Sequence, residues 1–339
     1  MAYEDQEKDD GCFFPPEFLT KVCAVRFPGA EGQNPALVDP SDGGVHEVAT
    51  AGIIGGMRGK RCVACHGSWF LVLDEATREC FLTTLFVTSP SPPPSSEGEA
   101  GTTTVVPLPP MPADPPHLEL LFNCALSAPT PTAPGCVVVL GLIGERFLRY
   151  CRPGDEAWSQ VEVKLDDEVD TFDGAVAFHG GRIYATTGAS YAVVLDASSP
   201  AAAAAPRVER TDVTVPAPFP INQDMRQHLV ATTSPNGGDL YFVRAYLFGF
   251  PAEVFGFDVC RWDPSEAVWR DVDSIGDTTL FVGSNCFSVS PATEAGTEPD
   301  CIHVLRSCYD GVRVYTISLH DMTIRCNWVR IDDDDDDDD

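Results

Sequence analysis

One short segment, Cys62-Val63-Ala64-Cys65-His66, combines residue types and a spacing that could do chemistry. The C-x-x-C-H pattern is typical of covalent haem attachment, and paired cysteines also serve as zinc ligands or redox thiols. Haem attachment requires export, but residues 1–10 are acidic and lack the apolar stretch of a secretory signal. Zinc would need a second C-x-x-C or a pair of histidines, and neither accompanies the motif. We therefore expect Cys62 and Cys65 to be buried or half-buried thiols on a strand, with a metal or redox role as the alternative.

Histidine is the other residue type that could act as a general acid or base. The chain has seven: His46, His66, His117, His179, His228, His303 and His320. His179 precedes a Gly-Gly turn and His303 lies in an apolar run, so we interpret both as loop or packing residues. The sequence has no nucleophile elbow, zinc-protease motif, P-loop or dinucleotide fingerprint. We predict no catalytic, cofactor-binding or metal-binding residues, and we expect no cofactor. A propeller enzyme, with a site assembled from several repeats, is kept as an alternative.

The elements that would position any site are short. The chain contains 29 prolines and 28 glycines, and no apolar pattern of helical period persists over a dozen residues. Runs rich in Val, Ile, Phe and Tyr recur instead between turn residues, which predicts an all-β chain. The clearest expected strands are 22–27, 36–38, 45–48, 70–73, 80–86, 136–142, 147–150, 254–260 and 312–317.

Internal echoes indicate a repeat of 55 to 60 residues. Gly180-Gly181 followed by Tyr184 is echoed by Gly237-Gly238 followed by Tyr241, and Trp158, Trp269 and Trp328 are spaced at about one or two such periods. This pattern resembles a loose kelch repeat, in which glycines turn the chain and the aromatic rings fill the space between blades. We predict a single kelch-like β-propeller over residues 21–331 with about six blades, five or seven being the alternatives.

Several segments are expected to lie outside the regular strands. They are a flexible acidic N-terminus at 1–20, a Pro-rich disordered loop at 88–117, an alanine run at 201–205, a polar loop at 291–300 and a poly-Asp tail at 332–339. Their compositions bury too little apolar area to offset the entropy lost on ordering. The eight aspartates repel one another and should remain extended.

The overall charge restricts the class of partner. The net charge is −29 and the isoelectric point about 4.3, so the surface repels phosphate, and we expect neither nucleic acid nor membrane as a partner. No apolar run approaches the ~20 residues of a membrane helix. The thirteen cysteines fit a reducing compartment, so the expected location is cytoplasmic or nuclear.

Four segments carry a family resemblance: 60–74 with its His-Gly-Ser-Trp-Phe-Leu-Val, 172–184, 255–262 and 277–289. The most specific is Leu-Phe-Val-Gly-Ser-Asn-Cys-Phe-Ser at 280–288. Together they resemble the plant domain of unknown function described as a KIB-type β-propeller, which is often carried on F-box proteins. The resemblance runs in order from about residue 21 to 331.

This resemblance implies a function in protein recognition. F-box members are similar to substrate-recognition subunits of cullin-type ubiquitin ligases, in which the F-box holds a Skp-type linker and the propeller holds the target. Only about 20 residues precede the first expected strand here, fewer than the 40 to 50 of an F-box. We therefore predict a stand-alone, non-catalytic propeller that binds an unidentified protein, with its binding surface unassigned. The alternative is a ligase substrate adaptor, with the Skp-type linker and cullin as indirect partners through another protein or a missing F-box.

Overall fold

The computed structural model of the chain describes its strands and many of the connections between them. The described residues are 11–14, 23–26, 36–38, 45–47, 60–66, 69–74, 76–84, 104–112, 121–162, 171–188, 191–196, 207–211, 213–214, 224–232, 238–249, 253–283, 286–294, 296–308 and 311–330. The alanine run and the poly-Asp tail lie outside them. Cys62 and Cys65 lie on a described strand, but their side chains are outside the description.

The described strands form six sheets, and the first three follow the order of the chain. The first sheet contains β1 (Gly11–Phe14), β2 (Cys23–Arg26), β3 (Ala36–Val38) and β4 (Val45–Glu47). The second contains β5 (Lys60–His66), β6 (Trp69–Asp74), β7 (Cys80–Thr84) and β8 (Val105–Leu108). The third contains β9 (Leu121–Leu126), β10 (Val138–Leu142), β11 (Phe147–Cys151) and β12 (Ser159–Glu162).

The remaining sheets include both five-stranded ones. The fourth contains β13 (Phe172–His179), β14 (Arg182–Thr187), β15 (Tyr191–Asp196), β16 (Arg207–Thr211) and β17 (Val213–Thr214). The fifth contains β18 (Asp224–Ala231), β19 (Leu240–Phe248), β20 (Glu253–Asp263) and β21 (Val268–Asp271). The sixth contains β22 (Thr279–Val282), β23 (Phe287–Val289), β24 (Cys301–Cys308), β25 (Gly311–Ser318) and β26 (Thr323–Arg330).

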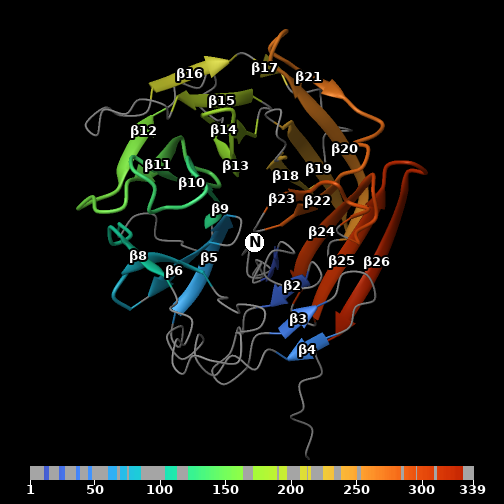
Figure 1. Cartoon of the computed structure of the whole chain (residues 1–339), viewed down its shortest axis with the longest axis horizontal. Coiled ribbons are helices and arrows are strands. Elements are labelled where there is room, and N and C mark those ends of the chain that lie inside the picture. Colours follow the sequence, from blue (N-terminus) through green and yellow to red (C-terminus); the bar gives the residue numbers. More distant parts are fainter. Residues whose placement is uncertain are drawn as a thin grey trace, which may run out of the picture.

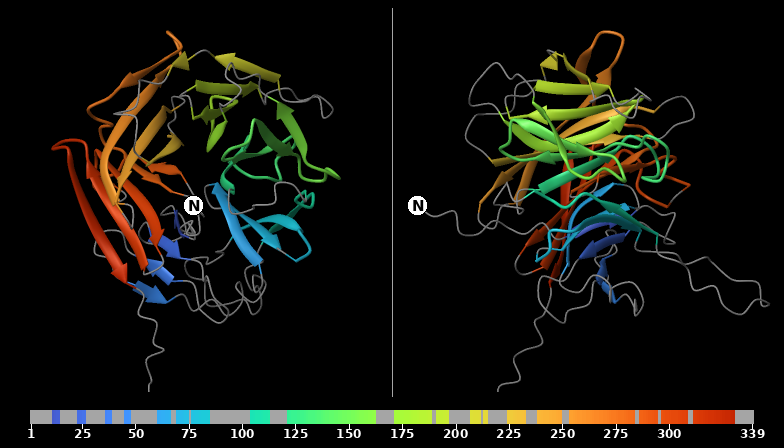
Figure 2. Two further views of the ribbon diagram at one scale, coloured as in Figure 1. Left: turned by 180° about the vertical axis from the view of Figure 1, so that it is seen from behind. Right: turned by 90° about the vertical axis from the view of Figure 1, so that its left-hand side faces the viewer.

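The sheets are arranged around one axis, as Figures 1 and 2 show from opposite sides. The innermost strands β5, β9, β13 and β18 contact one another in succession, and β18 contacts β22 and β23. Strand β1 contacts β24, which brings the two ends of the described chain together. This arrangement confirms the predicted all-β propeller.

The core consists of four apolar clusters, each lying between two successive sheets from the second to the sixth. Leu71 and Leu140, for example, belong to the cluster between the second and third sheets, and Leu280 to the cluster between the fifth and sixth. The other two clusters join the third sheet to the fourth and the fourth to the fifth. The third, fourth and fifth sheets have an apolar cluster on each face, so their buried strands are apolar at nearly every position. Strand β10 is buried at every position.

The sequence echoes correspond to equivalent places in different sheets. Tyr184 and Tyr241 are both buried on the second strand of their sheets. Trp158, Trp269 and Trp328 lie at or next to the last strand of theirs. The first two tryptophans are buried between sheets, as expected: Trp158 Nε1 donates a hydrogen bond to the Pro109 carbonyl at 2.8 Å. Trp328 differs, because its side chain is 42% exposed.

Two neighbouring sheets approach so closely at one point that only glycine fits. A Cβ atom on Gly141 of β10 would lie 2.4 Å from the carbonyl oxygen of Gly174 on β13. This is less than any ordinary contact distance, so a side chain here would push the third and fourth sheets apart.

Two expected boundaries are wrong. Strand β1 lies inside the segment 1–20 that we expected to be flexible, and β8 lies inside the Pro-rich segment 88–117. Strand β8 tolerates Pro107 because it is the outer strand of its sheet, where a missing N–H need not break a ladder. Arg78 Nε also donates to the Met111 carbonyl at 2.9 Å, which fixes the residues after β8.

The polar loop 291–300, expected to be mobile, is held by hydrogen bonds. Strand β23 ends beside Thr279 at the start of β22, and β24 begins beside the same residue on the other side, so the connection crosses the start of β22. Backbone N–H groups of Ala292 and Asp300 donate to the carbonyls of Asp277 and Thr278, at 3.0 and 2.9 Å. This connection is therefore a structural part of the sixth sheet.

Replacing Trp269 with alanine should destabilise the fold by about 3–5 kcal/mol, because its ring fills the junction between the fourth and fifth sheets. The ring lies 5.3 Å from Trp262 and 5.7 Å from Phe242, centroid to centroid. Denaturant unfolding followed by circular dichroism measures the loss. Trp328→Ala, at the exposed position, is the size-matched control and should cost about 1 kcal/mol or less. Equal losses in both variants would contradict the assigned packing.

Candidate functional site

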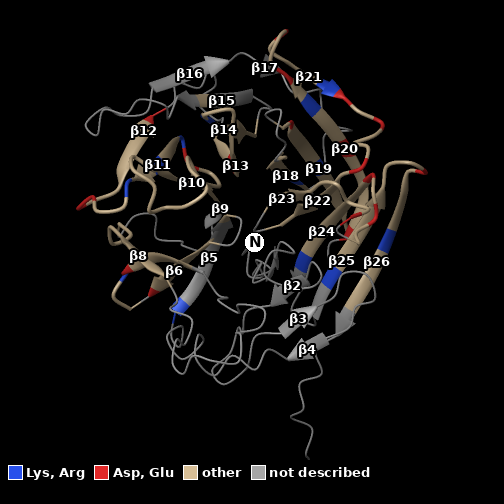
Figure 3. Cartoon of the chain, viewed as in Figure 1, with Lys and Arg blue, Asp and Glu red and all other residues tan. Residues whose placement is uncertain are grey.

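The junction between the fifth and sixth sheets combines buried polar groups with exposed aromatic rings. Its interior is the apolar cluster of β19, β20, β22, β24 and β25. Polar side chains lie at three places around that cluster: next to β23, along the 290–300 connection, and where β20 and β25 meet. Figure 3 shows Lys or Arg segments on β24, β25 and β26, with Asp and Glu concentrated in turns nearby.

Next to β23, a histidine and a cysteine form a contact. His228 Nδ1 lies 3.7 Å from Cys286 Sγ, and this thiol also faces the Gly283 carbonyl at 3.6 Å. Burial, reinforced by the charges of Arg226 and Arg306, lowers the pKa of His228 to about 3. A Cys–His pair becomes a nucleophile when the imidazole holds the thiol proton. A histidine with so low a pKa is neutral in the folded protein at neutral pH.

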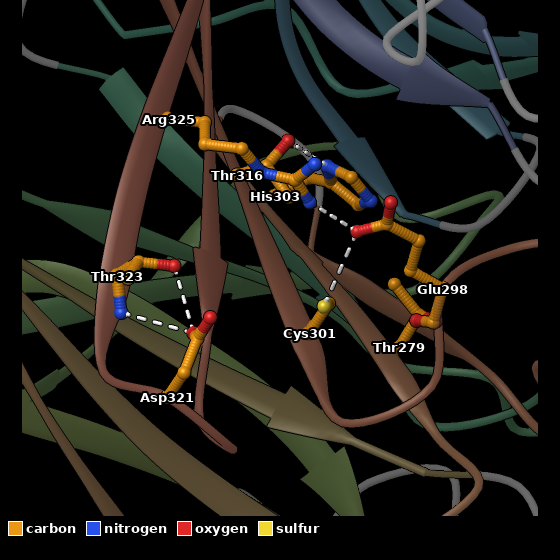
Figure 4. A network of polar contacts seen from close by, with 8 residues as sticks. All are labelled: Thr279, Glu298, Cys301, His303, Thr316, Asp321, Thr323 and Arg325. Atoms are coloured by element: carbon orange, nitrogen blue, oxygen red, sulfur yellow. Dashed lines mark hydrogen bonds and ion pairs between the residues drawn. The ribbon is translucent and has the colours of Figure 1, made fainter.

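Along the 290–300 connection, Glu298 organises a network of polar contacts (Figure 4). Its carboxylate pairs with Arg325 on β26 and accepts from Cys301 Sγ at 3.6 Å. Its backbone carbonyl accepts from Thr279 Oγ1 at 2.5 Å. Burial raises the pKa of Cys301 to about 12, so the thiol stays protonated. These contacts tie the connection to strands on both of its sides.

His303 lies beside this network and behaves as a packing residue, as the sequence indicated. Its Nδ1 lies 3.0 Å from Thr316 Oγ1, and its ring stacks on Phe281 with centroids 4.9 Å apart. Burial lowers the pKa of His303 to about 4, although the nearby Glu298 partly opposes the shift.

The other histidines are spread around the ring. Desolvation lowers the pKa of His66, at the end of β5, to about 4, against a hydrogen bond with the backbone of Cys124. Burial also lowers the pKa of the half-buried His179, whose ring lies 6.2 Å from Tyr184. His320 is exposed in a turn. The His46 side chain and His117 lie outside the described residues.

Exposed aromatic rings lie at the β19–β20 hairpin, and an ion pair joins the start of β20 to β25. Phe248 and Phe255, at the hairpin between β19 and β20, are 70% and 44% exposed, and their centroids are 6.2 Å apart. Glu253 Oε1 lies 3.5 Å from Arg313 Nη1, and the Arg313 guanidinium lies 5.2 Å from the centre of the Trp328 ring. We call Phe248 and Phe255 the aromatic surface.

A buried polar group supports this surface from below. Arg244 is fully buried and lies 3.3 Å from Asp258, which also accepts a hydrogen bond from the Tyr246 hydroxyl. The Tyr246 ring in turn contacts Phe255, with centroids 6.2 Å apart. The exposed ring of Phe255 therefore packs on Tyr246, whose hydroxyl is held by Asp258.

The sequence interpretation assigned no binding surface and missed the aromatic one. The available signal was Phe248-Gly249-Phe250-Pro251, in which aromatic residues flank a Gly and a Pro typical of a turn. A turn is normally exposed, so aromatics beside one indicate exposed rings.

Searches for a metal site and for a membrane helix gave no candidate in the described part of the chain. Among those residues, no three His, Cys, Asp or Glu side chains group closely enough to hold a metal ion. Within the same residues, no helix has the length and hydropathy needed to cross a membrane.

The fold defines the protein as a β-propeller. The KIB1-4 beta-propeller family model matches residues 37–328, and the chain belongs to that family. No curated protein matches the sequence.

Solved structures with a similar fold share little sequence with this chain. The Pseudomonas aeruginosa periplasmic gluconolactonase PpgL is 13% identical with a TM-score of 0.41, covering 94% of this chain and 84% of that one. A putative 6-phosphogluconolactonase from Bacteroides uniformis is 12% identical with a TM-score of 0.40, covering 89% and 80%. The Cps50 (Swd1) β-propeller domain of Myceliophteria thermophila is 10% identical with a TM-score of 0.37, covering 91% and 80%. Similarities of this size carry no information on activity.

Acid should destabilise the protein through its buried histidines. Because the folded-state pKa of His303 lies near 4, against 6.5 for a free histidine, the unfolded chain binds more protons between these pH values. Its contribution is complete above pH 6.5 and falls by about 3 kcal/mol as the pH drops to 4. His303→Asn, which retains a polar atom facing Thr316, should show a smaller loss of unfolding free energy over this range. His320→Gln, at an exposed position, is the control and should retain the wild-type pH dependence.

Proposed function

We propose that this protein is a non-catalytic, protein-binding propeller that recognises its partner through the aromatic surface. Each of the six sheets would act as one blade of a kelch-like ring, with the binding surface at the β19–β20 hairpin of the fifth. The observation that carries the proposal is the exposure of Phe248 and Phe255, at 70% and 44%, in a chain of net charge −29.

Three properties of the aromatic surface suit protein recognition. Large aromatic rings dominate the binding energy of many interfaces, because they bury much apolar area with few rotatable bonds. Phe255 is supported by Tyr246, which hydrogen bonds to Asp258, so little ordering is needed on binding. Glu253, the cross-strand neighbour of Phe248, supplies a polar group beside the exposed rings, as is typical of the edge of an interface.

The surrounding charge also favours a particular kind of partner. A strongly acidic protein attracts basic or polar faces and repels acidic ones, mainly through the rate of association. We therefore expect a partner with an apolar contact patch bordered by Lys or Arg. A non-catalytic binding role requires no oxidation of cysteines. It is therefore compatible with the expected location in the cytoplasm or nucleus, where thiols stay reduced.

The double substitution Phe248→Ser and Phe255→Ser should reduce recovery of the partner at least about tenfold, because each ring is expected to act as an anchor. The measurement is affinity capture with the tagged full-length chain from a plant extract, read by quantitative mass spectrometry. Val268→Ser replaces another exposed apolar side chain, on β21, and should leave recovery unchanged.

Thermal melting of all three proteins checks that the variants are folded. Unchanged recovery by a folded double variant would contradict the role of the aromatic surface. Capture of a Skp-type linker and a cullin would favour the ligase-adaptor function over a stand-alone binding role.

A further inference from the structure

The β19–β20 hairpin separates its buried side chains from its exposed ones. Leu247 and Val254 are cross-strand partners, and both belong to the apolar cluster between the fifth and sixth sheets. The next pair toward the end of the hairpin is Phe248 with Glu253. Because successive side chains of a strand point to opposite faces, Phe248 and Glu253 share the face that is turned away from that cluster.

A β-bulge adds Phe255 to the same face. The register shifts between Tyr246 and Leu247, because Phe255 is an extra residue of β20 at this point. Bulges redirect side chains, and here the Phe255 ring lies with its centroid 6.2 Å from the ring of Tyr246 on one side and 6.2 Å from that of Phe248 on the other. The aromatic surface is thus built by a specific backbone feature.

The two rings of the aromatic surface are arranged to attract a cation. They meet edge to face, at an interplanar angle of 77°, and Phe248 and Phe255 are 70% and 44% exposed. The face of an aromatic ring is electronegative and attracts a cation that lies within about 6 Å of its centre. Among the described residues, no lysine or arginine of the chain lies over either ring.

Glu253 adds a carboxylate next to these rings. Directly opposite side chains in an antiparallel pair have their Cβ atoms about 4.5–5.5 Å apart, so a cation on the Phe248 ring can reach Glu253. The Glu253 side chain is 68% exposed, and Arg313 approaches only its Oε1, at 3.5 Å. In the part of the chain that the structure describes, this carboxylate has no other ion pair or hydrogen bond. One carboxylate oxygen is therefore accessible to a second cation.

The same strands show which cation suits a ring beside a carboxylate. Further along the hairpin, the Arg244 guanidinium lies 5.5 Å from the centre of the Phe242 ring and 3.3 Å from the carboxylate of Asp258. A guanidinium is planar and weakly hydrated, so it can lie on a ring and donate to a carboxylate at the same time. The aromatic surface and Glu253 offer an equivalent combination to an arginine from outside.

We propose that Phe248, Phe255 and Glu253 bind an arginine side chain exposed on the partner protein, with its guanidinium over a phenylalanine ring and an N–H donated to the Glu253 carboxylate. The inference rests on the proposed function, because it names the partner chemistry that the aromatic surface recognises. The net charge of −29 favours the approach of such a group.

Selected peptides test the proposal without knowledge of the partner. A phage library of random peptides is first depleted on the folded Phe248→Ser, Phe255→Ser double variant, which removes peptides that bind elsewhere on the acidic chain. It is then selected on the full wild-type chain. The best peptide is synthesised with a fluorescein label, and fluorescence anisotropy measures its affinity. We expect it to contain arginine, and a best peptide without arginine, or none after depletion, would overturn the proposal.

Two analogues of the selected peptide test the guanidinium itself. Citrulline has nearly the shape of arginine but no charge, and it should weaken binding at least about tenfold. Lysine keeps the charge but cannot stack and donate in the same way, so it should weaken binding at least about threefold. Equal affinity of the citrulline analogue would overturn the proposal, and equal affinity of the lysine analogue would overturn the assignment to arginine.

The contact with Glu253 is tested on the full chain. Glu253→Gln should weaken the arginine peptide at least about threefold and the citrulline analogue much less, because the lost contact is charge-assisted. Glu266→Gln removes the same charge from an exposed turn between β20 and β21 and should leave affinity unchanged. Thermal melting checks that both variants are folded. Equal losses in the two variants would show that only the overall charge attracts the peptide and would overturn the contact.

The outcome can be separated from that of the proposed function. If capture of the partner depends on Phe248 and Phe255 but citrulline binds as well as arginine, the arginine is wrong and protein recognition through the aromatic surface stands. If the peptide requires its arginine but the double substitution has no effect on capture, the rings bind a guanidinium and the proposed recognition of the partner through them is wrong.

Discussion

Face-to-face packing of neighbouring sheets is the interaction on which the whole molecule depends. Among the described side chains, each apolar cluster is shared by two sheets, so the second to sixth sheets bury their apolar faces against one another. This packing requires the inner strands to come very close, and the contact of Gly141 with the Gly174 backbone shows how little room remains. Strand composition, sheet spacing and the position of every exposed residue follow from this constraint.

Buried arginines recur in this packing. Arg149, Arg244 and Arg313 lie in three different junctions, each with its guanidinium 5.0–5.5 Å from the centre of an aromatic ring. In two of them the ring belongs to the residue two positions earlier on the same strand, Phe147 or Phe242, so both side chains are on one face. A guanidinium is weakly hydrated for a cation and stacks on aromatic faces, which makes it suitable for a narrow space between sheets. In the third case the ring is that of Trp328, which is exposed at the surface.

The sequence was sufficient for the class of fold because turn residues and apolar runs are local signals. Its repeat spacing identified Tyr184 and Tyr241 as equivalent, and the family segments identified the KIB1-4 beta-propeller family. The sequence did not predict features that depend on which strands and sheets lie next to one another in the fold. Strand β8 was hidden among prolines because only its place at the edge makes Pro107 acceptable. Both Trp269 and Trp328 lie on the outer strand of their sheets, so the repeat spacing could not predict that the first is buried and the second exposed.

The contact between β1 and β24 has a consequence for synthesis on the ribosome. Residues 11–14 are synthesised long before residues 301–308, which supply their contacts in the sixth sheet. At about 5–20 residues per second, this interval lasts about 15–60 s. The later sheets can pack in order as they emerge, because each contacts mainly the sheet before it. The first sheet forms its contacts with the sixth only after the sixth has been synthesised. The growing chain is thus an open arc, and its first sheet lacks its contact with the sixth until the final strands emerge.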